Sequence, residues 1–300
     1  MEMVTGNLPE AELDPPTPQT PPAQYVAAEY VLETMGRAGV RRIRTLSAVQ
    51  VFLLGVVGGA FITVGALFSV LLGAAVHTPG PQRLLEGLGF SAGFFFVILS
   101  EAALFTEANV TLPATLLRHD VDAPGRRVAR FWALAWAGNL AGAMLTGLAI
   151  HAAQRYPSDV THLLGELVRR KMSYRAVGGV GEWFKLILSG MLANWLVGMA
   201  AFFAVMGRTL FGKYIPVFLA VTLFVAANFQ HSPANMGYFS LIMPSGHGPG
   251  WGPALWWNVI PAGIGNIIGG SVLVVLPFWF ALHRRERPSL LRPRASDLQR

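Results

Sequence analysis

The chain has 300 residues, of which 53% are hydrophobic and only 13% are charged, so it is not an ordinary soluble protein. Its net charge of +7 does not indicate nucleic-acid binding, because most Lys and Arg residues lie beside long apolar runs. With no cysteine, the chain has neither disulfides nor thiolate metal sites.

Two segments precede the first long apolar run. Residues 1–24 are rich in proline and acidic residues and lack an apolar core, which predicts a disordered tail and not a secretory signal. Residues 25–45 contain four arginines among apolar residues. We interpret them as a short amphipathic helix that is anchored to headgroups at the membrane surface.

Six apolar spans follow, and each is long enough to cross about 30 Å of hydrocarbon. They cover residues 46–76, 84–118, 127–152, 180–207, 214–243 and 254–282, within a predicted all-α membrane domain of residues 46–283. Fifteen basic residues lie near the span ends on the side of the N-terminus and six on the other side, so both termini are expected in the cytoplasm. Residues 284–300 form a basic cytoplasmic tail, and the expected location is the cell (inner) membrane.

Polar residues interrupt the second and the fifth span. In the fifth, an apolar segment turns abruptly into a polar one that contains Asn228, Gln230, His231, Pro233 and Asn235. Hydrocarbon offers no partners for such groups, and irregular backbone is tolerated there only where protein or a water-filled cavity surrounds it. The pattern predicts a discontinuous helix whose break lines a path for a polar solute.

A glycine motif repeats along the chain with a fixed offset. Residues 138–142 (GNLAG) and 265–269 (GNIIG) are 127 residues apart, and the same offset aligns residues 104–109 with the break in the fifth span. Three spans in each half give the halves opposite orientations. The sequence therefore predicts an inverted 3+3 repeat whose broken second and fifth helices meet near the midplane. The glycines allow close helix contact, across which Asn139 and Asn266 are expected to hydrogen-bond.

On these motifs the sequence resembles the formate/nitrite transporter family, a group of anion channels. The matching segments follow the family order and comprise residues 104–106, 138–142, 192–196, 229–236, 258–261 and 265–270. The resemblance extends over residues 25 to 283. It implies a homopentamer of six-helix protomers, each with its own pore, and an aquaporin-like fold.

The resemblance also implies which residues line the pore. His231 matches the central pore histidine, Thr106 the threonine in the interruption of the second helix, and Asn194 a pore-facing asparagine of the fourth helix. The apolar constrictions above and below the histidine are implied at Phe90, Phe94, Leu104, Phe105 and Phe224.

The chemistry of permeation fits a histidine at this position. Moving a bare anion through an apolar ring has an idealised cost of roughly tens of kcal/mol, which a weak acid avoids by crossing in its neutral form. Imidazole titrates near neutrality and is suited to supply the proton. The sequence leaves open whether His231 donates this proton or only a hydrogen bond, with water as the proton source.

Two departures from the family pattern concern charge. The family carries a lysine on the outer approach to the fourth helix, where this chain has Gly178, and Lys171, Arg175 and Lys185 lie nearby but out of register. Glu107 directly follows Thr106, and a carboxylate in the pore repels anions unless it is protonated or paired. Glu107 is interpreted either as a pore gatekeeper or as a residue bound to the amides of its own loop.

The expected function is a channel or transporter for small monovalent weak-acid anions of the formate, nitrite or hydrosulfide class, with proton coupling left open. The two departures support an alternative, a channel of the same fold for neutral solutes or cations. A non-conducting scaffold is a third interpretation. No metalloprotease, nucleophile-elbow or phosphate-loop motif occurs, so we expect no enzyme activity and no cofactor or metal. The expected partners are a small solute, the bilayer and further copies of the chain, and not nucleic acid.

Overall fold

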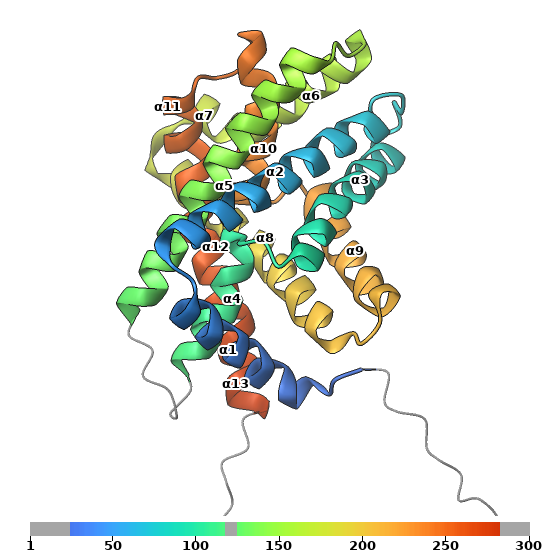
Figure 1. Ribbon diagram of the computed structural model, residues 1–300. Helices are drawn as coiled ribbons and strands as arrows, with labels where there is room; N and C mark the ends of the chain where they lie inside the picture. Colours follow the sequence, from blue (N-terminus) through green and yellow to red (C-terminus); the bar gives the residue numbers. More distant parts are fainter. Residues whose placement is uncertain (1–24, 118–124, 283–300) are drawn as a thin grey trace, which may run out of the picture.

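The computed structural model describes residues 25–117 and 125–282 as a helical protein (Figure 1). The first half contains α1 (Ala28–Thr45), α2 (Ala48–Gly73), α3 (Pro79–Ser100), α4 (Phe105–Leu116) and α5 (Gly125–Ala153). The second half begins with α6 (Ser158–Lys171), α7 (Ser173–Val177), α8 (Gly179–Met206), α9 (Leu210–Ala226) and α10 (Ser232–Ile242), followed by a 3-10 turn, Met243–Ser245. The expected tails, residues 1–24 and 284–300, lie outside the described residues.

A long helical span, Trp251–Leu282, closes the described chain and alternates between α- and π-helical turns. It consists of α11 (Trp251–Ala254), a π segment (Leu255–Val259), α12 (Ile260–Ile268), a second π segment (Gly269–Val275) and α13 (Leu276–Leu282). The first π segment directly precedes α12, whose second residue, Pro261, has no N–H to continue the α-helical ladder. Such turns recur at functional sites.

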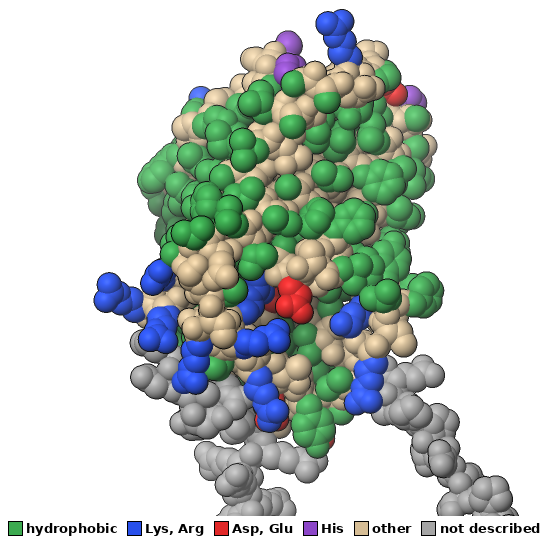
Figure 2. Space-filling view, viewed as in Figure 1, with side chains coloured by type: hydrophobic (Ala, Val, Ile, Leu, Met, Phe, Trp, Pro, Cys, Tyr) green, Lys and Arg blue, Asp and Glu red, His purple; other side chains and the backbone are tan. Residues whose placement is uncertain are grey.

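Within residues 25–117 and 125–282, five helices are long and apolar enough to cross a membrane, namely α2, α3, α5, α8 and the span Trp251–Leu282. Helix α9 is also apolar but shorter. In Figure 2 hydrophobic side chains cover the middle of the visible face, and most of its Lys and Arg side chains gather at the end that carries α1 and α13. This distribution is the one expected for a bilayer-embedded protein with one basic end.

The glycine motifs bring two helix pairs into close contact, as the sequence predicts. Helix α5 packs against α2, and α12 packs against α8. A Cβ atom at Gly138 would lie 2.9 Å from the Cα of Gly55, and one at Gly265 would lie 3.0 Å from the Cα of Gly190. Any side chain at these two positions would push the paired helices apart.

The helical path stops twice inside the molecule. Residues 101–104 separate α3 from α4, and residues 227–231 separate α9 from α10. Glu101 and Asn228 have left-handed backbone conformations, with φ of 54° and 56°, which are uncommon outside glycine. Residues 102–104 and 230–231 are buried, so both non-helical segments need hydrogen-bond partners from the protein.

Helices α6 and α7 occupy the stretch between the third and fourth apolar spans, for which no helix is predicted from the sequence. Helix α6 is amphipathic and lies at the end of the molecule opposite α1 (Figure 1). Its buried residues include Leu163, Leu167 and Lys171, and it contacts α10 and α2. This covering helix places a cation next to the second non-helical segment.

Candidate functional site

The first non-helical segment is held by one asparagine of α5. The backbone N–H of Phe105 donates to Oδ1 of Asn139 at 2.9 Å, and Nδ2 of Asn139 donates to the carbonyl of Ala103 at 2.9 Å. The same Nδ2 reaches the carbonyl of Gly55 on α2, also at 2.9 Å. One buried amide therefore binds backbone groups within the interruption and at the start of α4, and it joins α5 to α2.

The second non-helical segment is held in the same way by Asn266 of α12. The N–H of Ser232 donates to Oδ1 of Asn266 at 2.8 Å, and Nδ2 of Asn266 donates to the carbonyls of Gln230 at 3.1 Å and Gly190 at 2.8 Å. Ala103, Phe105 and Asn139 each have their counterpart 127 residues later in the chain. The glycine motif predicts that Asn139 and Asn266 hydrogen-bond across the helix contacts. It does not predict that the same asparagines bind the two non-helical segments.

His231 forms the N-cap of α10 and is 1% exposed. Its Nδ1 accepts a hydrogen bond of 3.1 Å from the N–H of Ala234. Because Nδ1 accepts, the neutral imidazole carries its proton on Nε2. This Nε2 is buried and has no hydrogen-bond partner within the described part of the chain. The fold thus leaves the Nε2–H of His231 as a free donor in the protein interior.

Aromatic rings cover the imidazole. The ring of Phe224 lies 5.2 Å from His231, Phe90 meets Phe224 edge-on at 5.7 Å, and Tyr238 stacks on Phe90 at 6.0 Å. Phe94 and Leu104 are buried in the same apolar cluster as Phe90 and Phe224, and Phe105 is buried at the start of α4. The structure thus brings Phe90 and Phe224 to the histidine, with Tyr238 as a ring that the sequence does not single out.

Asn194 hydrogen-bonds to the backbone of Thr106 and also to the network that holds the segment with His231. Nδ2 of Asn194 donates to the carbonyls of Thr106 at 3.3 Å and Asn266 at 2.6 Å. Since Asn266 also binds Gln230 and Ser232, one network joins the two interruptions. Oγ1 of Thr106 and Oδ1 of Asn194 are buried without a partner among the described residues. Buried polar atoms of this kind are expected to hydrogen-bond to water or to a solute.

The side chains of Gln230, Asn235 and Asn258 form a further set of hydrogen bonds at the second interruption. Oε1 of Gln230 accepts hydrogen bonds of 3.0 Å from Asn235 and of 3.0 Å from Asn258. Asn258 also donates to the backbone carbonyl of Lys171 at 2.9 Å. Gln230 and Asn235 belong to the polar segment seen in the sequence. Asn258 lies in a matching motif, but no sequence signal indicates its partners.

Comparison with known proteins identifies the family. The model of the family described as formate/nitrite transporter matches residues 29–280. The chain belongs to the formate/nitrite transporter family. Together with the five apolar helices, this makes it a multi-pass membrane transport protein, in a family of transporters and channels rather than enzymes.

Relatives and solved structures of this family cover most of the chain. It is 27% identical to a probable formate transporter of Methanothermobacter thermautotrophicus over 77% of this chain and 88% of the relative. It is 29% identical to the formate channel FocA of Escherichia coli (strain K12) over 81% and 89% of the two chains. A solved pentameric formate channel with formate bound is 22% identical, with a TM-score of 0.65 over 79% of this chain and 98% of that one, and it shows the shared fold alone.

In this member of the family, Glu107 contacts α1. Its carboxylate lies 3.2 Å from Nη1 of Arg42, with both side chains mostly buried. Nη2 of Arg42 reaches the carbonyls of Glu101 at 3.3 Å and Ala102 at 3.4 Å, in the first interruption. The charge of Glu107 is therefore paired, and Arg42 ties α1 to the segment that precedes Thr106.

Lys171 is a buried basic residue at the opposite end of the molecule. It ends α6, is 5% exposed, and its Nζ lies 5.2 Å from the centre of the Tyr238 ring. Burial, with help from the neighbouring Arg170, lowers the pKa of Lys171 to about 7. Gly178 occupies the position at which the family has a lysine. Of the three basic residues near it in the sequence, Arg175 and Lys185 are exposed. Position along the chain does not reveal which of the three is buried.

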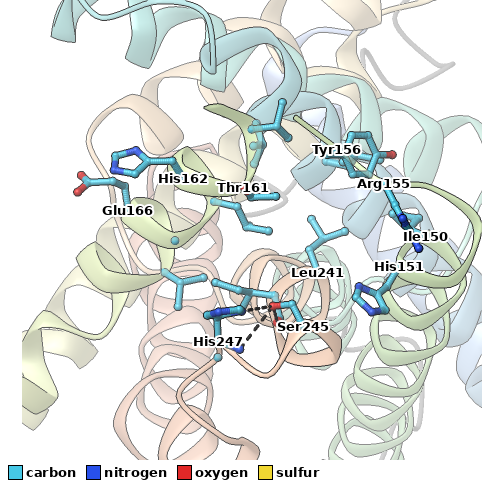
Figure 3. A pocket seen from close by; sticks show the side chains of 18 of the residues that line it. Ile150, His151, Arg155, Tyr156, Thr161, His162, Glu166, Leu241, Ser245 and His247 are labelled. Carbon is cyan, nitrogen blue, oxygen red and sulfur yellow. Dashed lines mark hydrogen bonds between the residues drawn. The ribbon is translucent and has the colours of Figure 1, made fainter. Parts of the chain in front are cut away.

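A large cavity of the transporter lies away from these residues. It has a volume of about 1340 Å³ and opens between the end of α5, α6 and the turn after α10 (Figure 3). None of the predicted site residues lines it. His151, His162 and His247, to which the sequence assigns no role, surround it, and His247 lies next to Ser245. No cluster of His, Asp or Glu suited to a metal occurs in the described ranges.

Proposed function

We propose that the chain forms a channel or transporter for small monovalent weak-acid anions of the formate, nitrite or hydrosulfide class. The solute passes His231 between the two non-helical segments, with one pore in each protomer. Family membership and the names of relatives, among them a formate channel, support this class of substrate. The observation that carries the proposal is the buried Nε2–H donor of His231.

The proposed architecture is an inverted repeat of six spans. Helices α3 and α4 form the broken second span, and α9 and α10 form the broken fifth. The equivalent hydrogen bonds of Asn139 and Asn266, 127 residues apart, support this arrangement. The basic end in Figure 2 supports cytoplasmic termini and insertion in the inner membrane. The fold shared with a pentameric formate channel supports a homopentamer.

In the proposed mechanism His231 donates a hydrogen bond to the permeating anion. Its Nδ1 is occupied as an acceptor for Ala234. A proton on Nδ1 would replace this acceptor with a second donor and break the N-cap. The geometry therefore favours a neutral imidazole that stabilises the anion through Nε2–H, with water as the proton source, over an imidazole that transfers its own proton.

The surrounding residues complete the path. The rings of Phe90 and Phe224 exclude water next to the histidine, which strengthens the hydrogen bond to the anion. The unpartnered Oγ1 of Thr106 offers a hydroxyl on the side of the first interruption. Phe94, Leu104 and Phe105 form the remaining apolar walls, and Asn194 keeps the two interruptions together.

The contacts of Glu107 and Lys171 weaken the alternative of a cation or neutral-solute channel. Arg42 neutralises Glu107, so this carboxylate does not repel anions. Lys171 supplies a cation near Tyr238, although it is out of register with the family lysine. We propose that this lysine attracts the anion to the outer side of the constriction.

Reconstituted protein tests the proposal. Proteoliposomes with the full chain are expected to take up formate and to exclude gluconate, which is too large for the path. Under a formate gradient, the reversal potential should follow the anion. Equal and negligible uptake of the two anions contradicts the proposed function, and a reversal potential that follows the cation supports the alternative.

A further inference from the structure

We propose that the basic end of the protein contains a binding site for the headgroup of an anionic phospholipid, formed by Arg44, Arg127 and Arg130. These three side chains line one cavity of about 250 Å³ between the α1–α2 turn and the start of α5. Neither the comparisons nor the proposed transport path assigns a role to this cavity.

The site lies at the level where two membrane-crossing helices begin. Helix α2 starts at Ala48, where Ser47 and Gln50 form a reciprocal capping box that fixes the turn after α1. Helix α5 starts at Gly125, and both helices are long enough to cross the bilayer. The cavity between their first turns is therefore expected at the boundary of hydrocarbon and water, where lipid headgroups lie.

Within the described ranges, no acidic side chain pairs with these three arginines. Among the described residues none of them forms an ion pair or hydrogen bond, whereas Arg37, Arg41 and Arg42 of α1 each pair with a glutamate. Three like charges around one small cavity repel each other, and a bound anion relieves this repulsion. Guanidinium groups match the oxygens of a phosphate in a bidentate fashion.

The rest of the cavity is apolar, which favours a lipid over a free phosphate. Its wall consists of Ile43, Leu46, Ala48, Val51, Phe131 and Leu134. Val51 and Phe131 are each only 3% exposed and form a packed floor. Such a surface suits the glycerol backbone and the first acyl carbons below a phosphate. Basic pockets between membrane helices on the cytoplasmic side have this character when they bind anionic lipids.

Phe131 connects the cavity to the contacts that hold the first non-helical segment. The guanidinium group of Arg42 lies 5.3 Å from the ring centre of Phe131, and the same Arg42 binds Glu107 and the carbonyl of Glu101. A lipid held by Arg44 on α1 and by Arg127 on α5 bridges these two helices at this point. The bound lipid therefore stabilises the packing of α1.

Lipid retention by the full-length protein tests the site. Native mass spectrometry and thermal unfolding in detergent compare phosphatidylglycerol with phosphatidylcholine and with inorganic phosphate. The wild type should retain phosphatidylglycerol preferentially and should melt at a higher temperature in its presence. In the triple variant Arg44→Gln, Arg127→Gln, Arg130→Gln, the ratio of retained phosphatidylglycerol to phosphatidylcholine should fall by about tenfold or more.

A matched control removes three charges from the same basic end but outside the cavity, through Arg126→Gln, Arg208→Gln and Lys213→Gln. This control should keep the preference of the wild type. Equal losses in both triple variants, unchanged retention in the cavity variant, or equal protection by inorganic phosphate each overturn the proposal. If the cavity triple variant does not fold, the single variants Arg127→Gln and Arg130→Gln should each lose part of the preference, and their failure to do so overturns it as well.

Discussion

Lys171 illustrates how burial changes a single residue. The unfolded chain has an ordinary lysine with a pKa near 10.5, whereas burial in the fold lowers the pKa to about 7. Between about pH 7 and 10.5 the unfolded state therefore binds more protons than the folded state, and the free energy of unfolding rises with pH across this window. Below pH 7 both states hold the proton, and the contribution of this lysine is constant.

The variant Lys171→Met tests this dependence. It should be more stable than the wild type below pH 7, and its advantage should shrink as pH rises above 7. Thermal unfolding in detergent at several pH values measures the difference, with Lys213→Met as a control for a lysine that is only partly buried. A difference between wild type and Lys171→Met that stays constant from pH 6 to pH 9 contradicts the assignment.

Arg42 and Glu107 form a pair whose two members depend on each other. Arg42→Met leaves the carboxylate of Glu107 without its partner in a mostly buried position and is expected to cost about 3 kcal/mol. The double variant with Glu107→Gln should recover part of this loss, because no unpaired charge remains. A double-mutant cycle on unfolding free energies measures the coupling, and purely additive effects would show that the pair contributes no interaction.

At the scale of secondary-structure elements, one asparagine holds each non-helical segment. Asn139→Ala or Asn266→Ala leaves a buried N–H and two carbonyls without this partner, with an expected loss of about 2–3 kcal/mol in each variant. Because the two residues make equivalent contacts, the two losses should be similar. Thermal unfolding measures both, and an unchanged melting temperature in either variant would contradict the role of that asparagine.

The glycines between helices permit a matched comparison. A Cβ at Gly142 would lie 2.8 Å from the carbonyl carbon of Val56, so Gly142→Ala should force α2 and α5 apart at a cost of roughly 1–3 kcal/mol. Gly165 on α6 has open space around its Cβ position, and Gly165→Ala should be neutral or stabilising by up to about 1 kcal/mol. Unfolding temperatures that rank the two variants in the opposite order would be inconsistent with this packing.

For the whole molecule, composition and the 127-residue offset predict much of the fold. They indicate a membrane protein and the positions of the apolar helices. The offset places the first interruption at residues 104–109, whereas in the structure α3 ends at Ser100 and α4 already begins at Phe105. Composition and the offset do not predict α6 and α7, because short amphipathic helices between spans have no hydrophobic run of membrane length. The tertiary position of Lys171 is therefore hidden as well, since α6 is what carries it to Tyr238.

The candidate site is predictable to a similar extent. The polar segment around His231 marks this histidine as a candidate site residue. Which of its two ring nitrogens carries the proton depends on the hydrogen bond from the N–H of Ala234, which only the structure of the helix cap reveals. The partner of Glu107 lies 65 residues earlier on α1, and no local pattern connects the two. Contacts between distant segments decide the charge of the candidate site and are not encoded in any one motif.

The central claim is that a permeating anion accepts a hydrogen bond from Nε2 of His231. Uptake of formate by proteoliposomes with wild type and with His231→Asn tests it most directly, because asparagine also caps helices and preserves the start of α10. With equal amounts of folded protein, the account predicts uptake lower by about 10- to 100-fold in the variant, since a hydrogen bond to a charged group is lost. Uptake equal to that of the wild type would contradict it.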